Sequence, residues 1–411
     1  MSSGSEHPAD SDAGQPNARI LQEINVRFEY PVIFCADMLA RDQGDLHWAL
    51  TRLRHGDERI RVYAIADAGF LAAWPDVGDR LTAYFQRHAA SLELCGPLQH
   101  VPGGEAAKND PALVSQLRDD FARARLDRHA VVLTFGGGAV LDAVGYAAAT
   151  THRGLRLVRA PTTVLAQNDA GIGVKNGVNT HGVKNFVGTF APPAAVLCDH
   201  RWLTTSSIRD RRAGLAEAVK VALLRDTAFF RWMQRYASAL AEQDPAAERH
   251  MIRRCAELHL DHIRSAGDPF ESGSARPLDY GHWAAHKLER LTDHALRHGE
   301  AVAIGMALDA CCAANIGWLA PSVAAEILAL LTTLGLPIWH DALAEVDAQG
   351  HPIVYPGVEE FREHIGGPID ITLLTEIGAC RSRHAMSVAD VQAAIARLDV
   401  ERRRRPTADL R

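Results

Sequence analysis

In the first half of the chain, short β-branched runs alternate with amphipathic helical stretches, and this alternation restricts the possible folds most. Helical apolar spacing occurs over residues 77–90 and 111–124. Three other runs are typical of buried strands, at residues 61–66, 130–135 and 155–160. Strands separated by helices are typical of a mostly parallel sheet. We therefore expect a Rossmann-like α/β domain over residues 18–199.

The second half of the chain has helical spacing almost throughout, as over residues 213–230, 247–265 and 301–317. This pattern predicts an all-α C-terminal domain over residues 200–400. Residues 1–17 are rich in Ser, Gly, Pro and Asp and lack an apolar core, so we expect disorder rather than a signal peptide. Residues 401–411 begin with a basic run and are expected to form a solvated tail.

Composition excludes several classes of protein. Apolar residues make up 47% of the chain and charged residues 23%, and the formal net charge is -6. These values fit a globular protein, whereas a general nucleic-acid binder is expected to be basic. No apolar run reaches the roughly 18–20 residues of a membrane helix, so we expect neither nucleic acid nor membrane as a partner. Seven cysteines without a CxxC pair indicate free thiols in a reducing compartment, and hence a cytoplasmic protein.

A run of three glycines at residues 136–138 joins the predicted strand at 130–135 to a helix-like stretch. Glycines here allow the backbone to approach a pyrophosphate at the helix N-terminus. A turn that only packs a strand against a helix has the same composition, and the run is not the GxGxxG fingerprint. Asp67 ends another predicted strand, where a carboxylate suits ribose hydroxyls, and Glu105 and Lys108 share one loop.

The long segment from residue 160 to 185 combines recurrent glycines with many polar side chains, among them Asp169, Lys175, Lys184 and Asn185. Lysine and asparagine donors in a Gly-rich loop suit an oxyanion such as phosphate. A merely solvated loop does not usually interleave Val, Ile and Leu so closely. We therefore expect this segment to bind a ligand.

A glutamate and several histidines in the second half form a candidate metal site. Glu217 and Lys220 share one face of an apolar helix, where charges are expensive to bury unless they are paired or bound to a metal. His282 and His286 lie on one helical face, and His298 precedes another apolar helix. One Glu and two His leave a position open for water or substrate, as in catalytic zinc sites. A simple salt bridge and structural histidines remain the alternative on spacing alone.

Seven motifs occur in order and at compatible intervals between residues 25 and 398: GGGxxxD, PTT, DxxxGxK, KN, GLAExxK, GHxxxH and HGEAVAxGM. Together they resemble the 3-dehydroquinate synthase superfamily of sugar-phosphate cyclases. The phrase GDPFESGSARPLDYGHWAAHKLE is also similar to the EboD-type dehydroquinate-synthase-like members. The resemblance implies a carbon–oxygen lyase acting on phosphates, with NAD and a divalent metal, zinc or cobalt. It further implies transient oxidation of a ring alcohol, loss of phosphate and closure of a carbocycle.

The resemblance assigns roles residue by residue. The implied metal ligands are Glu217, His282 and His298. The implied catalytic and substrate contacts are Asp169, Lys175, Asn185, Lys220 and His286. The implied NAD contacts are Asp67, Glu105, Lys108, Gly136, Gly137, Gly138, Asp142, Thr162, Thr163 and Lys184. Arg153 resembles the arginine that reaches the phosphate in the neighbouring subunit, which implies a homodimer.

The chain departs from the dehydroquinate synthase pattern around the end of the substrate that lacks the phosphate. Where the family has an arginine and an asparagine, this chain has Ala275 and Asp279, and Asp261 stands near the position of a family lysine. Glu363 and His364 stand in place of a basic DKK stretch. A substrate carboxylate would therefore lose charge-assisted partners.

These departures predict a carboxylate-free phosphorylated sugar, such as sedoheptulose 7-phosphate, as the substrate. Arg276 is one position from the lost arginine and would be the compensating cation for a carboxylated substrate. The alternatives are 3-dehydroquinate synthase proper, a metal-dependent polyol or glycerol-type dehydrogenase, and a non-catalytic protein of the same fold. The presence of all three expected metal ligands argues against the last of these.

Overall fold

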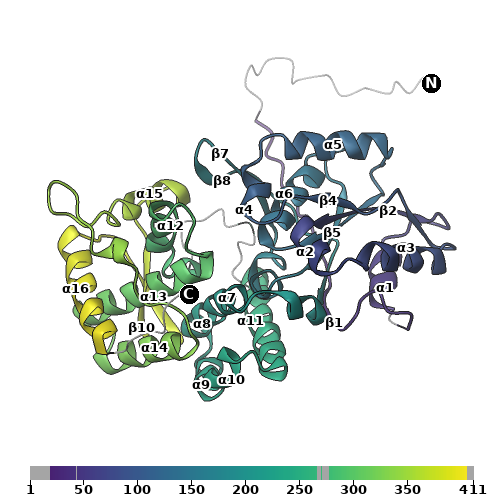
Figure 1. The fold of residues 1–411 in the computed structure, drawn as a ribbon. Coiled ribbons are helices and arrows are strands. Elements are labelled where there is room, and N and C mark those ends of the chain that lie inside the picture. The colour runs from purple at the N-terminus through teal and green to yellow at the C-terminus, as the bar shows by residue number, and fades with distance from the viewer. Residues whose placement is uncertain (1–18, 43, 266–269, 271–276, 405–411) are drawn as a thin grey trace, which may run out of the picture.

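The computed structural model describes residues 19–42, 44–265, 270 and 277–404, which form two halves that lie side by side (Figure 1). The expected disorder of residues 1–17, together with Ala275, Arg276 and the end of the basic run, lies outside the described residues. In the described ranges, no helix has both the length and the apolar character needed to cross a bilayer. No cysteine in these ranges forms a disulfide.

The first half is built on a seven-stranded parallel sheet with strand order β1-β9-β6-β5-β2-β3, and β4 pairs with the carboxyl end of β2. The strands of this sheet are β1 (Val32–Cys35), β2 (Ile60–Asp67), β3 (Leu92–Leu94), β4 (Gln99–Val101), β5 (Val131–Gly136), β6 (Arg156–Pro161) and β9 (Ala195–Asp199). A separate antiparallel hairpin consists of β7 (Lys175–Thr180) and β8 (Val183–Phe190). The helices of this half are α1 (Asp45–Thr51), α2 (Ala68–Ala73), α3 (Val77–Arg87), α4 (Glu105–Asn109), α5 (Leu113–Arg123), α6 (Gly138–Ala149) and the π-helix η1 (Ala166–Ala170).

Helices cover both faces of the sheet, and for this reason its central strands β5 and β6 are buried along nearly their whole length. One face packs against Leu46 and Leu81 of α1 and α3. The other face packs against Phe121 and Val144 of α5 and α6. The predicted strands at 61–66, 130–135 and 155–160 appear as β2, β5 and β6, so the predicted parallel α/β sheet is confirmed.

The second half is formed by helices packed around α13 (His298–Asn315), which is buried along nearly its whole length. The other elements are η2 (His200–Thr205), α7 (Ile208–Ala213), α8 (Leu215–Arg225), α9 (Thr227–Arg235), α10 (Ala237–Ala241), α11 (Pro245–Ser265), η3 (Pro277–Asp279), α12 (His282–Leu291), α14 (Pro321–Thr333), η4 (Asp341–Leu343), α15 (Gly357–Ile365) and α16 (Val388–Arg404), with the strands β10 (Ile371–Glu376) and β11 (Ala379–Arg383). Figure 1 shows α7, α8 and α11 at the junction with the α/β half. The helical character expected for this half is confirmed.

Two details of the second half differ from the sequence-based expectation. β10 and β11 form an antiparallel hairpin. The first four residues of β10 are all buried, and periodicity does not distinguish a short continuous apolar run in a strand from one in a helix. Arg402, Arg403 and Arg404 form the last turn of α16 instead of a tail, with Arg402 paired to Asp399 at 2.7 Å. Cations at a helix C-terminus are favoured by the helix dipole.

Glycines allow the backbone of α13 to approach its neighbours closely. A Cβ atom at Gly299 would lie 1.8 Å from the carbonyl oxygen of Ala213, and one at Gly305 would lie 2.0 Å from the carbonyl oxygen of Gly281. Gly281 itself has a φ of 81° and precedes α12. These contacts set the distance between α13 and the starts of α8 and α12, which carry the candidate metal ligands.

Replacement of Gly305 by Ala is expected to lower the free energy of unfolding by about 1–3 kcal/mol, because the added Cβ collides with the Gly281 carbonyl. The control is Gly78→Ala in α3, where a Cβ atom meets nothing within 4 Å. This control is expected to raise the free energy of unfolding by about 0.5–1 kcal/mol. Urea unfolding followed by circular dichroism measures both variants. Equal changes in the free energy of unfolding would show that the contact between Gly305 and the Gly281 carbonyl does not constrain the packing of α13.

Candidate active site

The glycine turn lies at the carboxyl edge of the sheet, between β5 and α6. A Cβ atom at Gly136 would lie 2.8 Å from Val140, and one at Gly138 would lie 3.0 Å from Ala170. Close packing therefore accounts for glycine at these two positions. Gly137 is the N-cap of α6, and no side chain caps this twelve-residue helix. The turn also fits a pyrophosphate, since the first N–H groups of a helix lack intrahelical acceptors.

Other predicted NAD contacts lie around this turn, because neighbouring parallel strands end at the same edge. Asp67 ends β2, and its Oδ1 accepts hydrogen bonds from the backbone N–H of Gly69 at 2.7 Å and of Phe70 at 3.1 Å. The N–H of Thr162 donates to the Gly136 carbonyl at 2.9 Å. Thr163 lies 3.3 Å from where a Cβ of Gly137 would stand. The structure thus brings Asp67 and both threonines to the glycine turn.

Five predicted site residues form a polar cluster beside the turn. The buried ammonium of Lys108 donates to Asp142 Oδ2 at 2.7 Å and also to Asn185 Oδ1. Glu105, on the same short helix, lies 3.7 Å from the ammonium of Lys184. Charge-assisted hydrogen bonds therefore join α4 and α6 to the β7–β8 hairpin.

Arg159 is a structural residue of the site that sequence reasoning missed. It is fully buried in β6 and donates to the backbone carbonyls of Gly171 at 3.1 Å, Gly173 at 2.8 Å and Lys175 at 2.9 Å. It also donates to Asn176 Oδ1 at 2.7 Å. These bonds hold the loop that precedes β7. An arginine inside the apolar run at 155–160 was the signal in the sequence that pointed to it.

Glu217, His282 and His298 converge from α8, α12 and α13. One ligand atom from each of the three lies within 4.8 Å of the other two. The Nε2 atoms of His282 and His298 lie 3.9 Å and 3.7 Å from Glu217 Oε1. His282 Nδ1 contacts the carbonyl oxygen of Tyr280 at 3.1 Å, and His298 Nδ1 lies 3.4 Å from Glu289 Oε2. Acceptors behind both rings favour a proton on Nδ1 and turn both Nε2 atoms toward Glu217.

The charges around the three residues keep Glu217 and His282 in the protonation states that bind a metal ion. Burial opposes ionisation of Glu217, but the ammonium of Lys220 and the two imidazoles keep its pKa well below the ordinary value. Burial and the nearby Lys220 lower the pKa of His282, so its ring is neutral. Burial alone would lower the pKa of His298, but Glu289 and Glu217 raise it to about 10. A cation between these two carboxylates is therefore favoured.

The three residues fit a divalent metal ion. Both carboxylate oxygens of Glu217 are buried; Oε2 contacts the ammonium of Lys220, whereas Oε1 has no hydrogen-bond donor within the described residues. Unsatisfied buried carboxylate oxygens are costly unless a cation lies next to them. Two nitrogens and one oxygen are also the ligand set of catalytic zinc sites that keep one position open. The ion pair of Glu217 with Lys220, which the sequence left as the alternative, is present as well.

Three of the predicted substrate contacts, Asp169, Lys175 and Lys220, come from η1, β7 and α8. Asp169 belongs to the π-helix η1 and accepts from His259 Nε2 at 3.0 Å. Lys220 is buried, and although burial opposes its charge, Glu217 and Asp169 raise its pKa. The side chain of Lys175 is exposed at the start of β7. Short π-helical turns are frequent at functional sites, which agrees with the place of Asp169.

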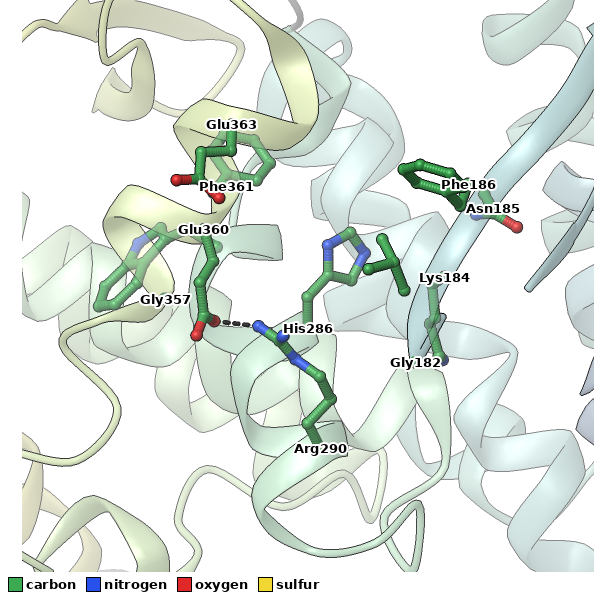
Figure 2. Close-up of a pocket in the computed structure, with 12 residues that line it drawn as sticks. Gly182, Lys184, Asn185, Phe186, His286, Arg290, Gly357, Glu360, Phe361 and Glu363 are labelled. Atoms are coloured by element: carbon green, nitrogen blue, oxygen red, sulfur yellow. Dashed lines mark hydrogen bonds and ion pairs between the residues drawn. The ribbon is translucent and has the colours of Figure 1, made fainter. Parts of the chain in front are cut away.

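A cavity of about 460 Å³ separates the β7–β8 hairpin from α12 and α15. Figure 2 shows Lys184, Asn185 and Phe186 on one wall, and His286 and Arg290 on another. The His286 ring lies 5.5 Å from that of His282 and 6.2 Å from that of His298. The cavity therefore borders the candidate metal ligands through His286. Arg290 forms an ion pair with Glu360 across the floor.

Arg153 is a predicted site residue that lies away from the glycine turn. It lies in an exposed turn after α6 with a φ of 64°. The glycine turn is at the other end of α6, about 18 Å away along a twelve-residue helix. Arg153 thus does not contribute to the glycine turn of its own chain.

The chain matches a known family over most of its length. Residues 98–213 match the family described as 3-dehydroquinate synthase N-terminal, and residues 214–351 match 3-dehydroquinate synthase C-terminal. The 3-dehydroquinate synthase of Halorhodospira halophila is 37% identical over 264 residues, which cover 64% of this chain and 72% of that protein. That of Nitrosococcus oceani is 40% identical over 238 residues, covering 58% and 66% of the two chains.

Solved structures show the same likeness. A 2-epi-5-epi-valiolone synthase from Streptomyces hygroscopicus subsp. jinggangensis 5008, with NAD+ and Zn2+ bound, is 29% identical with a TM-score of 0.81, covering 92% of this chain and 99% of that one. A 2-deoxy-scyllo-inosose synthase complexed with carbaglucose-6-phosphate, NAD+ and Co2+ is 21% identical with a TM-score of 0.70, covering 89% and 96%. The second likeness concerns the fold alone.

We propose that Glu217, His282 and His298 bind one metal ion. His282→Ala is expected to weaken Zn²⁺ binding by more than about 100-fold, because loss of a ligand costs more affinity than loss of a residue that hydrogen-bonds to a ligand. The matched control is His286→Ala, one turn later on the same helix and outside the three-residue cluster, which is expected to keep Zn²⁺ affinity. Competition with a chromophoric chelator measures both. Equal losses in the two variants would remove the assignment of these ligands.

Proposed function

Because this chain belongs to the 3-dehydroquinate synthase family, we propose that it is an enzyme that converts a seven-carbon sugar phosphate into a carbocycle and releases phosphate. The convergence of Glu217, His282 and His298 beside a cavity that both halves line supports this proposal most. A proposed metal site together with a proposed nucleotide site suits chemistry at an alcohol carbon.

NAD and one divalent metal ion, zinc or cobalt, are the proposed cofactors. When bound, NAD accepts and returns a hydride, and the metal ion withdraws electron density from a substrate oxygen. The three clustered ligands would hold the ion, and the first turn of α6 would hold the pyrophosphate. Asp67, Glu105, Lys108 and Asp142 would surround the remainder of the nucleotide. The related valiolone synthase structure holds NAD+ and Zn2+, which supports this assignment.

The protein's own side chains bind the substrate and hold protons at defined atoms. Lys220 Nζ, paired with Glu217, would donate a hydrogen bond to a substrate hydroxyl next to the metal ligands. The imidazole of His286 would contact the substrate from the cavity wall. Lys175 and Asn185 would bind the phosphate. The main contribution of these side chains together is to orient the substrate, which favours each step of the reaction by proximity.

A homodimer would complete the phosphate site. Arg153 is exposed and lies at the end of α6 opposite to the glycine turn of its own chain. A second copy would place this guanidinium at the neighbouring phosphate, where arginine binds in a bidentate manner.

The charges around the cavity support a neutral head group on the substrate. Arg290 is paired with Glu360, and Lys184 is paired with Glu289 at 2.7 Å. Asp279 lies near enough to Lys220 to raise its pKa. Lys184 and Arg290, the cations that line the cavity, are thus already paired with carboxylates. A substrate carboxylate would compete with these ion pairs. Hydroxyl groups would instead find acceptors.

The second candidate is 3-dehydroquinate synthase proper, because curated relatives with that name are 37% and 40% identical to this chain. It would act on the carboxylated seven-carbon sugar phosphate. A polyol or glycerol-type dehydrogenase differs from both in its outcome, since it would accumulate NADH and release no phosphate.

Steady-state kinetics with the NAD- and metal-loaded protein decides between these activities. We expect phosphate release without net NADH, and a higher kcat/KM for sedoheptulose 7-phosphate than for the carboxylated compound. Each charge-assisted bond that the carboxylate lacks corresponds to roughly 1.5–3 kcal/mol of binding. A higher kcat/KM for the carboxylated compound would refute the assignment of a neutral head group. Net NADH formation without phosphate would point to the dehydrogenase.

NAD is expected to bind more tightly than NADP, because the carboxylate of Asp67 at the end of β2 would repel a 2′-phosphate. Hydrogen bonds from the backbone N–H groups of Gly69 and Phe70 fix the orientation of the Asp67 carboxylate. Asp67→Asn keeps an acceptor for these bonds and is expected to reduce the difference in affinity between NAD and NADP. Isothermal titration with both nucleotides measures the two constants, and tighter NADP binding to the unaltered protein would contradict the prediction.

A further inference from the structure

Glu289 of α12 is a buried carboxylate whose two oxygens contact opposite sides of the site. Its Oε1 accepts a hydrogen bond from the ammonium of Lys184 in β8 at 2.7 Å. Its Oε2 lies 3.4 Å from Nδ1 of His298 in α13. The side chain of Glu289 is only 3% exposed. Glu289 therefore links a candidate metal ligand to the hairpin of the α/β half.

The contact with His298 explains why this link affects the metal site. With its Nδ1 atom facing Glu289, His298 directs its Nε2 atom toward Glu217 Oε1, 3.7 Å away. A carboxylate behind a ligating histidine fixes its tautomer and its ring orientation, and loss of such a partner weakens metal binding about 10–100-fold. The Tyr280 carbonyl has the same place behind His282.

Lys184 has two carboxylates within reach, and Glu289 is the stronger partner. Its ammonium lies 2.7 Å from Glu289 but 3.7 Å from Glu105, whose side chain is 41% exposed. Attraction between charges decreases with distance and with solvent screening, so the nearer and buried carboxylate prevails. Glu105 also accepts from Asn179 Nδ2 at 3.0 Å. Lys184 is therefore oriented toward α12 across the cavity.

The hairpin that carries Lys184 is anchored to the α/β half. Asn185, the next residue, accepts from Lys108, which also donates to Asp142 of α6 at 2.7 Å. Figure 2 shows Lys184 and His286 on facing walls of the cavity. Displacement of this hairpin would separate Lys184 from Glu289 and leave a buried carboxylate without its lysine, which is strongly unfavourable.

We propose that Lys184 is a positioning residue for the metal site, acting through Glu289 on the His298 imidazole, so that metal affinity depends on the position of the β7–β8 hairpin. The inference rests on the proposed metal site and goes beyond it, because Lys184 comes from the other half of the molecule. None of the described contacts joins Lys184 to the three ligands directly.

Titration of the metal-free protein with Co²⁺ alone, followed by d–d absorption, tests this proposal without NAD or substrate. Lys184→Met is expected to weaken Co²⁺ binding about tenfold and to shift the d–d bands, because the His298 ring loses its fixed orientation. Glu289→Gln is expected to weaken binding more, and the double variant no further than Glu289→Gln alone. Lys184→Arg keeps the charge and is expected to restore most of the affinity.

Lys287→Met is the matched control, since Lys287 lies two residues before Glu289 and pairs instead with Glu360 at 2.8 Å. It is expected to leave Co²⁺ affinity and spectrum unchanged, with circular dichroism showing that each variant is folded. Unchanged affinity in Lys184→Met, additive losses in the double variant, or an equal loss in Lys287→Met would each overturn the proposal. Failure of the unaltered protein to bind Co²⁺ would instead refute the proposed metal site.

Discussion

The buried charge of Glu217 is the constraint on which the rest of the site depends. Its carboxylate lies in an apolar helix, and its Oε1 atom has no hydrogen-bond donor within the described residues. Removal of such a group from water costs several kcal/mol unless positive charge surrounds it. Lys220 supplies one charge from the same helix, and the two imidazoles approach from α12 and α13. A metal ion among these groups would satisfy the Oε1 atom, which the protein leaves without a donor.

This convergence requires three helices to pack more closely than ordinary side chains allow. Gly299 and Gly305 bring α13 against the carbonyls of Ala213 and Gly281. Asp309, one turn further on, accepts from the N–H of Gly281 at 2.9 Å and from Trp283 Nε1 at 2.8 Å. Burial raises the pKa of Asp309 to about 7. The start of α12, and with it His282, is therefore positioned by backbone contacts and by a buried acceptor.

The α/β half contributes to the same site through its sheet edge. Parallel pairing places the ends of β2, β5 and β6 side by side, and the β7–β8 hairpin extends from this edge toward α12. Arg159 holds the loop before the hairpin, and Lys108 holds the hairpin to α6. The hairpin therefore lines one cavity together with His286, whose ring lies 5.5 Å from that of His282.

Local pattern was sufficient to predict the main strands, the helical second half and the candidate ligand types, because period and residue chemistry are properties of short segments. It was not sufficient for β10, whose short apolar run carries no distinguishing period, or for Arg159, whose partners are backbone carbonyls outside its own strand. Spacing placed His282 and His286 on one face without distinguishing them; the resemblance assigned His282 to the metal, and the packing brings His282 and not His286 into the cluster with Glu217.

The sequence by itself determined which side chains are available for metal, nucleotide and phosphate, and roughly where each lies along its element. Only the tertiary structure decided how their charges pair. The resemblance predicted Lys184 as an NAD contact, yet its ammonium donates to Glu289, 105 residues away in the chain. Glu289 received no role from the sequence, although it lies behind His298. The reason is physical: residue type determines what a group can bind, whereas the strength of an ion pair depends on distance and burial across the folded cleft.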